Sequence, residues 1–259
     1  MTTWDPKVGF VITPAGGTTF RAAYFETTGT AGIREFELIE PTTMSGFNQT
    51  FFDVFPGTRA RNTAIGIDQK FDSKTYIGAE AMHRSLKRKF PLSVSSLYFD
   101  SFDGSLQDQE IFVQEDDAHI DEDIAKGYIY QVLHRTTTAT LDYLWNRDKD
   151  NYYGSEAKTN RVRTGVNYFD SSGFLTFARG TWRDQSLKGF FEYDENGAEL
   201  TNDFWILDVG AGYRIPNRRG QIVLTLTNLL DKDFYYLPSG IDPLVLPGFG
   251  ATLAFSYNF

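Results

Sequence analysis

The 259-residue sequence contains no cysteine, so it holds no disulfide framework and no thiolate metal site. It also lacks any uninterrupted apolar run near the roughly 18 residues that a membrane helix needs. Any crossing of a membrane would therefore have to use β-strands. Basic residues are fewer than acidic ones, which gives a net charge of −9. This charge argues against nucleic acid as a partner, because binding to phosphates needs a basic surface.

The stretch from Pro247 to Phe259 alternates with a period of two, as expected of a β-strand. One parity is apolar and aromatic, with Leu253, Phe255, Tyr257 and Phe259, and the other carries Thr252, Ala254, Ser256 and Asn258. A strand with one face toward lipid and the other toward a polar lumen has this pattern. The alternative is the last strand of a soluble sandwich or lipocalin-like barrel.

The same alternation recurs along the chain in about eleven segments of roughly ten to fourteen residues, the length of a tilted transmembrane strand. In one of the clearest segments, Ala139, Leu141, Tyr143 and Trp145 alternate with polar residues. Aromatic residues are abundant at 16%, as barrels with aromatic girdles require.

The links between these segments alternate in length. Every second link is short (14–17, 72–74, 135–136, 170–173 and 216–220), and those between are longer, notably 27–59 and 89–117. Short turns on one side and long loops on the other are typical of outer-membrane barrels. The sequence therefore predicts an all-β, antiparallel up-and-down transmembrane barrel segment of about 11 strands, in a single domain over residues 1–259.

We expect this segment to be an incomplete barrel. Bacterial single-chain barrels have even strand numbers that begin and end in the periplasm, whereas an odd count ending there starts outside. The first residues also lack the charged and apolar regions of a secretory signal. We therefore expect a missing N-terminal part and an unpaired edge at Lys7–Thr13.

Two motifs resemble those of TonB-dependent outer-membrane receptors. Thr225-Leu-Thr-Asn-Leu-Leu-Asp-Lys-Asp-Phe-Tyr-Tyr236 is similar to the penultimate-strand signature, in which Asn-Leu-Phe-Asp-Lys-x-Tyr precedes a long loop and a last strand. Trp4-Asp-Pro-Lys-Val-Gly9 followed by Thr19-Phe-Arg-Ala-Ala-Tyr24 resembles a mid-barrel hairpin of that family. The Arg-x-Pro motif that normally follows is absent, and the chain reads Ile39-Glu-Pro-Thr-Thr43 instead.

The resemblance implies an integral protein of the Gram-negative outer membrane that takes up a siderophore or another scarce nutrient. Its partners would be outer-membrane lipid, the barrel assembly machinery, a small-molecule ligand and, through an upstream plug region, an energy-coupling protein. The departure from the family pattern leaves an alternative, a plugless barrel that anchors a periplasmic module such as helical repeats.

Seven charged residues occupy the polar parity of the predicted strands and are expected to line the lumen: Asp68, Glu80, Asp142, Arg161, Arg163, Asp208 and Arg214. They could guide anionic solutes or pair across strands, and pairing is the favoured reading. Phe255, Tyr257 and Phe259 are expected to serve as an assembly signal, because the family's terminal aromatic strand is recognised by the assembly machinery.

Other chemistry has weaker support in the sequence. Asp117, Asp121 and Asp123 could bind Ca²⁺ through oxygen atoms, but the spacing lacks the glycine and terminal Glu of a calcium loop, which favours a solvated loop tip or the acidic top of a barrel. His83, His119 and His134 form no metal-binding or catalytic motif. We therefore expect no enzymatic activity, no catalytic or metal site and no cofactor.

Overall fold

The computed structural model describes residues 4–14, 16–28, 43–48, 58–99, 106–189, 199–216, 219–233, 235–236, 244–245 and 248–257. For residues 88–99, 106–117, 235–236 and 244–245 the structure describes the backbone but not the side chains. Phe259 and most of 27–59 lie outside the described residues.

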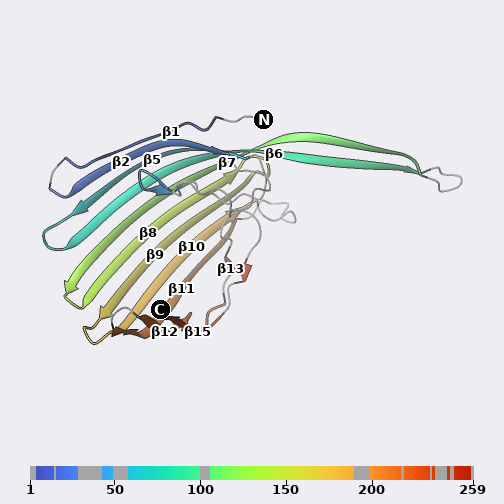
Figure 1. Ribbon diagram of the computed structural model, residues 1–259. Coiled ribbons are helices and arrows are strands. Elements are labelled where there is room, and N and C mark those ends of the chain that lie inside the picture. The colour runs from blue at the N-terminus through green and yellow to red at the C-terminus, as the bar shows by residue number, and fades with distance from the viewer. Residues whose placement is uncertain are drawn as a thin grey trace.

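Eleven strands form one antiparallel sheet that curves along its width (Figure 1). In sheet order they are β1 (Lys7–Ile12), β2 (Thr18–Thr28), β5 (Arg59–Lys70), β6 (Thr75–Phe99), β7 (Leu106–His134), β8 (Thr137–Asp150), β9 (Ser155–Phe169), β10 (Phe174–Lys188), β11 (Glu199–Ile215), β12 (Gly220–Thr227) and β15 (Gly250–Tyr257). This confirms the predicted all-β class, the antiparallel up-and-down order and the number of strands.

The sheet is not closed, as predicted for an incomplete barrel. β1 pairs with β2 alone and β15 pairs with β12 alone, so each has one edge without a partner strand among the described residues. Because each strand is antiparallel to its neighbour and their number is odd, β1 and β15 run in the same direction. A direct β1–β15 contact would therefore have to be parallel.

The prediction of a long loop at 89–117 is wrong. β6 and β7 continue through this region as a paired ribbon, in register from Thr75↔Gln131 to Ser96↔Glu110 and on toward its tip. Figure 1 shows this ribbon projecting well beyond the rest of the sheet. The polar composition of the region suggested a loop, but two strands of a ribbon satisfy each other's backbone groups without burying a face.

The link between β8 and β9, for which the sequence predicts a shorter loop over 148–154, is shorter still. Only residues 151–154 separate the two strands, because β8 and β9 extend to pair Asp150 with Ser155. Asp150 Oδ1 accepts backbone hydrogen bonds from Tyr152 (2.8 Å) and Tyr153 (3.2 Å), which holds the turn tight. A charged side chain thus serves as a turn acceptor where its polarity suggested a loop.

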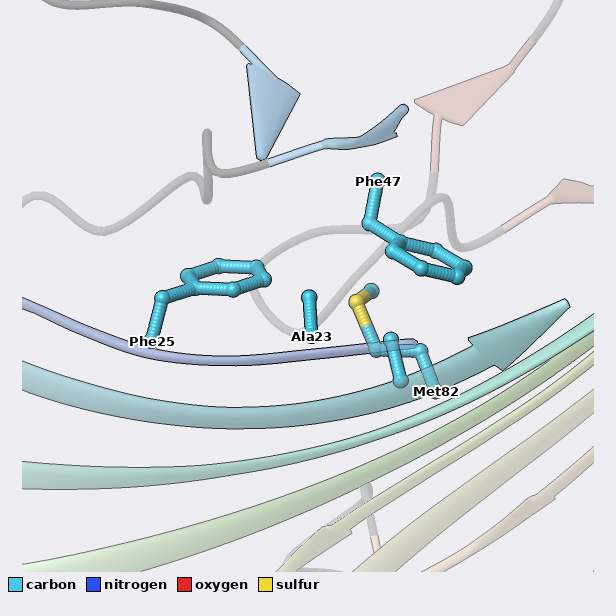
Figure 2. Close-up of a cluster of buried hydrophobic side chains, with 5 residues drawn as sticks. Ala23, Phe25, Phe47 and Met82 are labelled. Atoms are coloured by element: carbon cyan, nitrogen blue, oxygen red, sulfur yellow. The ribbon is translucent and has the colours of Figure 1, made fainter. Parts of the chain in front are cut away.

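A small buried cluster fixes a short hairpin onto one face of the sheet. β3 (Thr43–Met44) and β4 (Phe47–Asn48) place Phe47 against Ala23, Phe25, Ala64 and Met82. Figure 2 shows Phe47 above Ala23 and Met82, with Phe25 beside them. Phe47 is 1% exposed, so the hairpin covers this part of the face.

Candidate functional site

The register places all seven predicted lumen residues on the same face of the sheet, which we call the polar face. Asp68 on β5 lies opposite Gly78, then the row continues through Tyr128, Asp142 and Arg163 on successive strands. Glu80, Arg161, Asp208 and Arg214 share this parity on their own strands. β3–β4 packs on the same face.

Arg21 on β2 links two of the predicted carboxylates. Its Nε donates to Asp68 Oδ2 at 2.8 Å, and its Nη2 lies 3.5 Å from Glu80 Oε2. Lys126 Nζ reaches the other oxygen of Glu80 at 2.8 Å. The guanidinium of Arg21 also lies over the Phe47 ring, 4.8 Å from its centroid. Pairing across strands is therefore present at Asp68 and Glu80.

Two tyrosines extend this network along β7. The rings of Tyr128 and Tyr130 stack with centroids 4.7 Å apart. The Tyr128 hydroxyl donates to Asp68 and the Tyr130 hydroxyl donates to Asp142, both at 2.7 Å. A hollow of about 180 Å³ lies beside them, lined in part by Arg21, Glu80, Lys126, Tyr128, Asp142 and Arg161.

The arginines lie in a different part of the polar face. Arg161 on β9 is directly opposite Arg183 on β10. Arg163, two positions along β9, and Arg179, four positions along β10, share their face. Arg163 Nε is buried and has no hydrogen-bond partner among the described residues. Arg214 lies far from these residues, near the short turn that follows β11.

Asp208 binds the turn that contains the Thr225–Tyr236 motif. Asp208 Oδ1 accepts a hydrogen bond from Asn228 N at 3.0 Å. Asn228, with φ of 50°, uses its side chain to bond the backbone of Lys232 at 2.9 Å and 3.3 Å. Asp231 Oδ1 accepts from Phe249 N at 2.8 Å, immediately before β15. The motif thus positions the final strand.

At the end of the sheet that carries the longer links, a row of polar side chains crosses four strands. Asn62 lies opposite Arg84, Arg84 opposite Glu122, and Glu122 opposite Asp148. Arg84 donates to Asn62 and to Glu122, each at 2.7 Å. Burial, together with the facing Glu122 carboxylate, raises the pKa of Asp148 to about 7.

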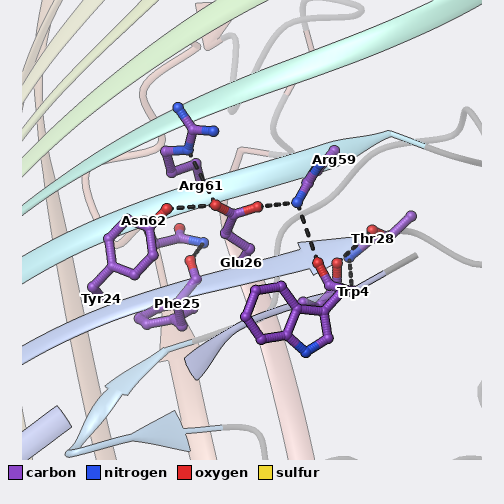
Figure 3. Close-up of polar contacts among 9 residues, drawn as sticks. Trp4, Tyr24, Phe25, Glu26, Thr28, Arg59, Arg61 and Asn62 are labelled. Carbon is purple, nitrogen blue, oxygen red and sulfur yellow. Dashed lines mark hydrogen bonds and ion pairs between the residues drawn. The ribbon is translucent and has the colours of Figure 1, made fainter. Parts of the chain in front are cut away.

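A second network ties the residues before β1 to β2 and β5 at the same end of the sheet (Figure 3). Glu26 is 5% exposed and is held by the Tyr24 hydroxyl, Arg59 and Arg61. The hydrogen bond from Tyr24 and the nearby Arg59 guanidinium hold the pKa of the Glu26 carboxyl below its usual value. Thr28 bonds Asp5 through its backbone and hydroxyl at 2.9 Å.

The opposite side of the sheet, which we call the apolar face, exposes a continuous hydrophobic band. Its exposed members include Phe10, Phe20, Ile65, Ile67, Ile77, Ile129, Leu141, Tyr143, Val166, Tyr168, Phe174, Trp205, Tyr213, Ile222, Leu224, Leu253, Phe255 and Tyr257. From Trp205 to Tyr213 the band is roughly 26 Å long at about 3.3 Å per residue. A strand tilt of about 40° reduces this to roughly 20 Å, close to the ~25 Å lipid-facing band of outer-membrane barrels.

Aromatic residues mark both margins of the band. Tyr143, Trp182 and Trp205 lie at the margin toward the longer links, where Trp182 is opposite Trp205. Tyr168 and Tyr213 lie at the margin toward the short turns. Beyond the first margin the same face becomes charged.

The charged part of this face is a set of cross-strand ion pairs. Arg147 lies 2.6 Å from Glu156, which also contacts Lys158 at 3.2 Å. The hydrogen bond from Arg147 holds the pKa of Glu156 below its usual value. His83 Nδ1 lies 2.7 Å from Asp123 Oδ1.

Several polar-face residues were not foreseen from the sequence: Arg21, Arg84, Lys126, Tyr128, Tyr130, Arg179 and Arg183. Strand parity was the available signal. Arg21 alternates with the apolar Phe20, Ala22 and Tyr24, so it belongs on the polar face by the rule that selected Asp68. Which residues bond to one another depends on the register between strands, and parity does not give the register.

The three histidines are dispersed. His83 pairs with Asp123 on the apolar-face side, and His134 contacts Thr136 in a short turn. Among the residues whose side chains are described, no group of three His, Cys, Asp or Glu is placed to hold a metal ion. Asp121 and Asp123 lie within β7, and the side chain of Asp117 lies outside the described set.

Comparison with protein families, characterised proteins and solved structures gave no match. No helix in the described part of the chain is long and apolar enough to cross a lipid bilayer.

Proposed function

We propose that the chain forms part of an integral outer-membrane β-barrel that takes up a scarce nutrient, such as a siderophore, in the manner of TonB-dependent receptors. The observation that carries this proposal is the exposed apolar band with aromatic margins. In water, so large a contiguous apolar surface would promote aggregation, whereas lipid acyl chains cover it without cost.

The polar face complements this band. Its ion pairs and hydrogen bonds suit a hydrated lumen, because charges on that side stay in contact with water or with one another. The Asn228–Asp231 turn and the long links that precede β5 and β15 also support the resemblance to receptors. The barrel assembly machinery and an energy-coupling protein are the partners that this function requires.

Membrane integration is tested by fractionation. The full-length protein, expressed in a Gram-negative host, should stay in the membrane after an alkaline carbonate wash and be released by detergent. It should also migrate differently on gels before and after boiling. A monodisperse monomer obtained without detergent would contradict the proposal.

The receptor role needs a separate test. Deleting the gene should impair growth on an iron–siderophore source under iron limitation, and a proton uncoupler should abolish uptake in the wild type. Growth unaffected by the deletion would exclude siderophore uptake. Uptake that persists with the uncoupler would instead indicate a passive conduit.

A further inference from the structure

We propose that the β3–β4 hairpin, seated by Phe47, limits the size of solute that can pass along the polar face. The inference deepens the proposed function and rests on it, because the polar face lines a lumen only if the sheet is part of a membrane barrel. Phe47 is then the residue that sets the size limit.

The first argument is an apolar patch on the polar face. Four side chains of β2, β5 and β6 have the parity of the charged residues but are apolar: Ala23, Phe25, Ala64 and Met82. Exposing such a patch to a hydrated lumen is unfavourable. Phe47 lies over the patch, as Figure 2 shows, and is 1% exposed. The patch is therefore a seat for the hairpin.

The second argument is the dependence of the hairpin on this seat. β3 and β4 pair over two residues each, Thr43↔Asn48 and Met44↔Phe47. An isolated two-stranded hairpin is marginally stable at best in water, and this one is very short. Met44 also packs against the buried cluster beside Phe47. Contacts with the sheet therefore hold the hairpin in place.

The third argument is the fit of the hairpin turn against Arg21. Ser45 and Gly46 have φ of 49° and 84°, and two successive positive φ values are typical of a type I′ turn. A Cβ added at Gly46 would come within 2.7 Å of Arg21 Nη1. Arg21 Cζ lies 4.8 Å from the Phe47 ring centroid, and Arg21 Nε donates to Asp68. The turn thus packs on a guanidinium that the sheet already holds.

The fourth argument is the burial of the polar face along the strands. On β9, Ser155, Ala157 and Thr159 near the longer links are buried, whereas Phe169 near the short turns is 44% exposed. Buried polar-face side chains at the longer-link end also occur on six other strands: Phe25, Asn62, Arg84, Ala118, Gln185 and Phe204. Side chains on the wall of an open lumen are buried only where other parts of the chain lie over them. The lumen is therefore narrowest at the longer-link end, where the hairpin lies.

Disulfide cross-linking of the full-length protein in detergent tests the seat. A Cβ added at Gly9 lies 3.3 Å from Ser45 Cβ, close to the separation of about 3.5–4.5 Å in disulfides. The chain has no other cysteine, so the variant with Gly9→Cys and Ser45→Cys should cross-link on mild oxidation. Gly180→Cys with Ser45→Cys is the control and should not cross-link, because Gly180 lies on the apolar face. Equal cross-linking of both pairs, or none at Gly9, would overturn the proposal.

The size limit is tested with vancomycin, a hydrophilic antibiotic that the intact outer membrane largely excludes. In cells that carry the full-length protein, Phe47→Ala should lower the inhibitory concentration of vancomycin by up to about tenfold, as the undocked fraction of the hairpin rises. Phe174→Ala is the matched control, because Phe174 is an exposed phenylalanine on the apolar face, and it should leave the inhibitory concentration unchanged.

The cross-link also separates a released hairpin from a misfolded variant. In the Phe47→Ala background, the oxidised Cys pair at positions 9 and 45 should restore exclusion of vancomycin, and a reductant should remove it again. Unchanged sensitivity of Phe47→Ala in a protein that fractionates with membranes would refute this inference alone. A protein that cross-links but does not fractionate with membranes would refute the proposed function, and the size limit with it.

Discussion

The ring of Tyr128 lies over Gly78, the residue directly opposite it on β6. A Cβ added at Gly78 would come within 2.3 Å of the Tyr128 ring and 2.6 Å of Asp68 Oδ1. The missing side chain lets the Tyr128 hydroxyl reach Asp68 across an intervening strand. One glycine therefore makes a three-strand polar network possible.

Gly78→Ala should displace Tyr128 and break its bond to Asp68. We expect a loss of about 1–3 kcal/mol in the free energy of unfolding, the usual cost of overpacking, measured by urea unfolding in detergent. Gly127→Ala is the control, because its added Cβ would meet no atom closer than 3.8 Å. Equal effects of both substitutions would show that the close approach at Gly78 is unimportant.

Substitution of Val166 by Arg tests whether lipid covers the apolar face. Val166 is 49% exposed within the band, and an arginine near the bilayer midplane costs about 2–4 kcal/mol. Thr201→Arg places the same charge on the same face, beyond the aromatic margin, and should be almost neutral. Unfolding from lipid bilayers measures both. A neutral Val166→Arg would place this face in water.

Asp148 should make stability depend on pH. Its pKa is raised from 3.8 to about 7, so the folded protein holds a proton that the unfolded chain releases. Stability contributed by this proton is present below about pH 4 and is lost as the pH rises to about 7. Asp148→Asn should therefore be more stable than wild type at pH 8, with a smaller difference at pH 4. A difference that does not change with pH would contradict the raised pKa.

Asn228 has two separable roles in the turn before the last strands. Asn228→Gly keeps the φ of 50° accessible but loses the side-chain bonds to Lys232. Asn228→Ala loses the bonds and adds backbone strain, which costs about 1–2 kcal/mol more. The thermal unfolding temperature should be highest for the wild type, lower for Asn228→Gly and lowest for Asn228→Ala. If Ala and Gly were equal, the backbone conformation would not matter.

The terminal aromatic residue is expected to matter for assembly. Phe255 and Tyr257 lie on the apolar face with ring centroids 6.4 Å apart, and Phe259 continues their parity in the sequence. Deleting Phe259 should lower the amount of full-length protein in the membrane while leaving ligand-contacting loops unaltered. Quantitative immunoblotting of membrane fractions measures this. Normal assembly of the deletion would leave these aromatic residues a packing role alone.

The number of strands, their antiparallel order and the face on which each side chain lies could all be predicted from the sequence. The reason is local: alternation with a period of two fixes the side of each residue, and turn residues mark where strands reverse. Asp68, Glu80 and Arg163 could be assigned to one face in this way. The extent of β6 and β7 could not, because polar residues are tolerated in a ribbon with no buried face.

Which polar residues meet could be learned only from the folded sheet. Asp68 pairs with Arg21 and Tyr128, whereas Arg161 faces Arg183, and both outcomes depend on the register between strands distant in sequence. A shift of one residue would reverse the faces, and a shift of two would keep them while changing every partner. Composition and parity do not reveal a shift of two residues. The polar networks and the facing arginines therefore follow from the register alone.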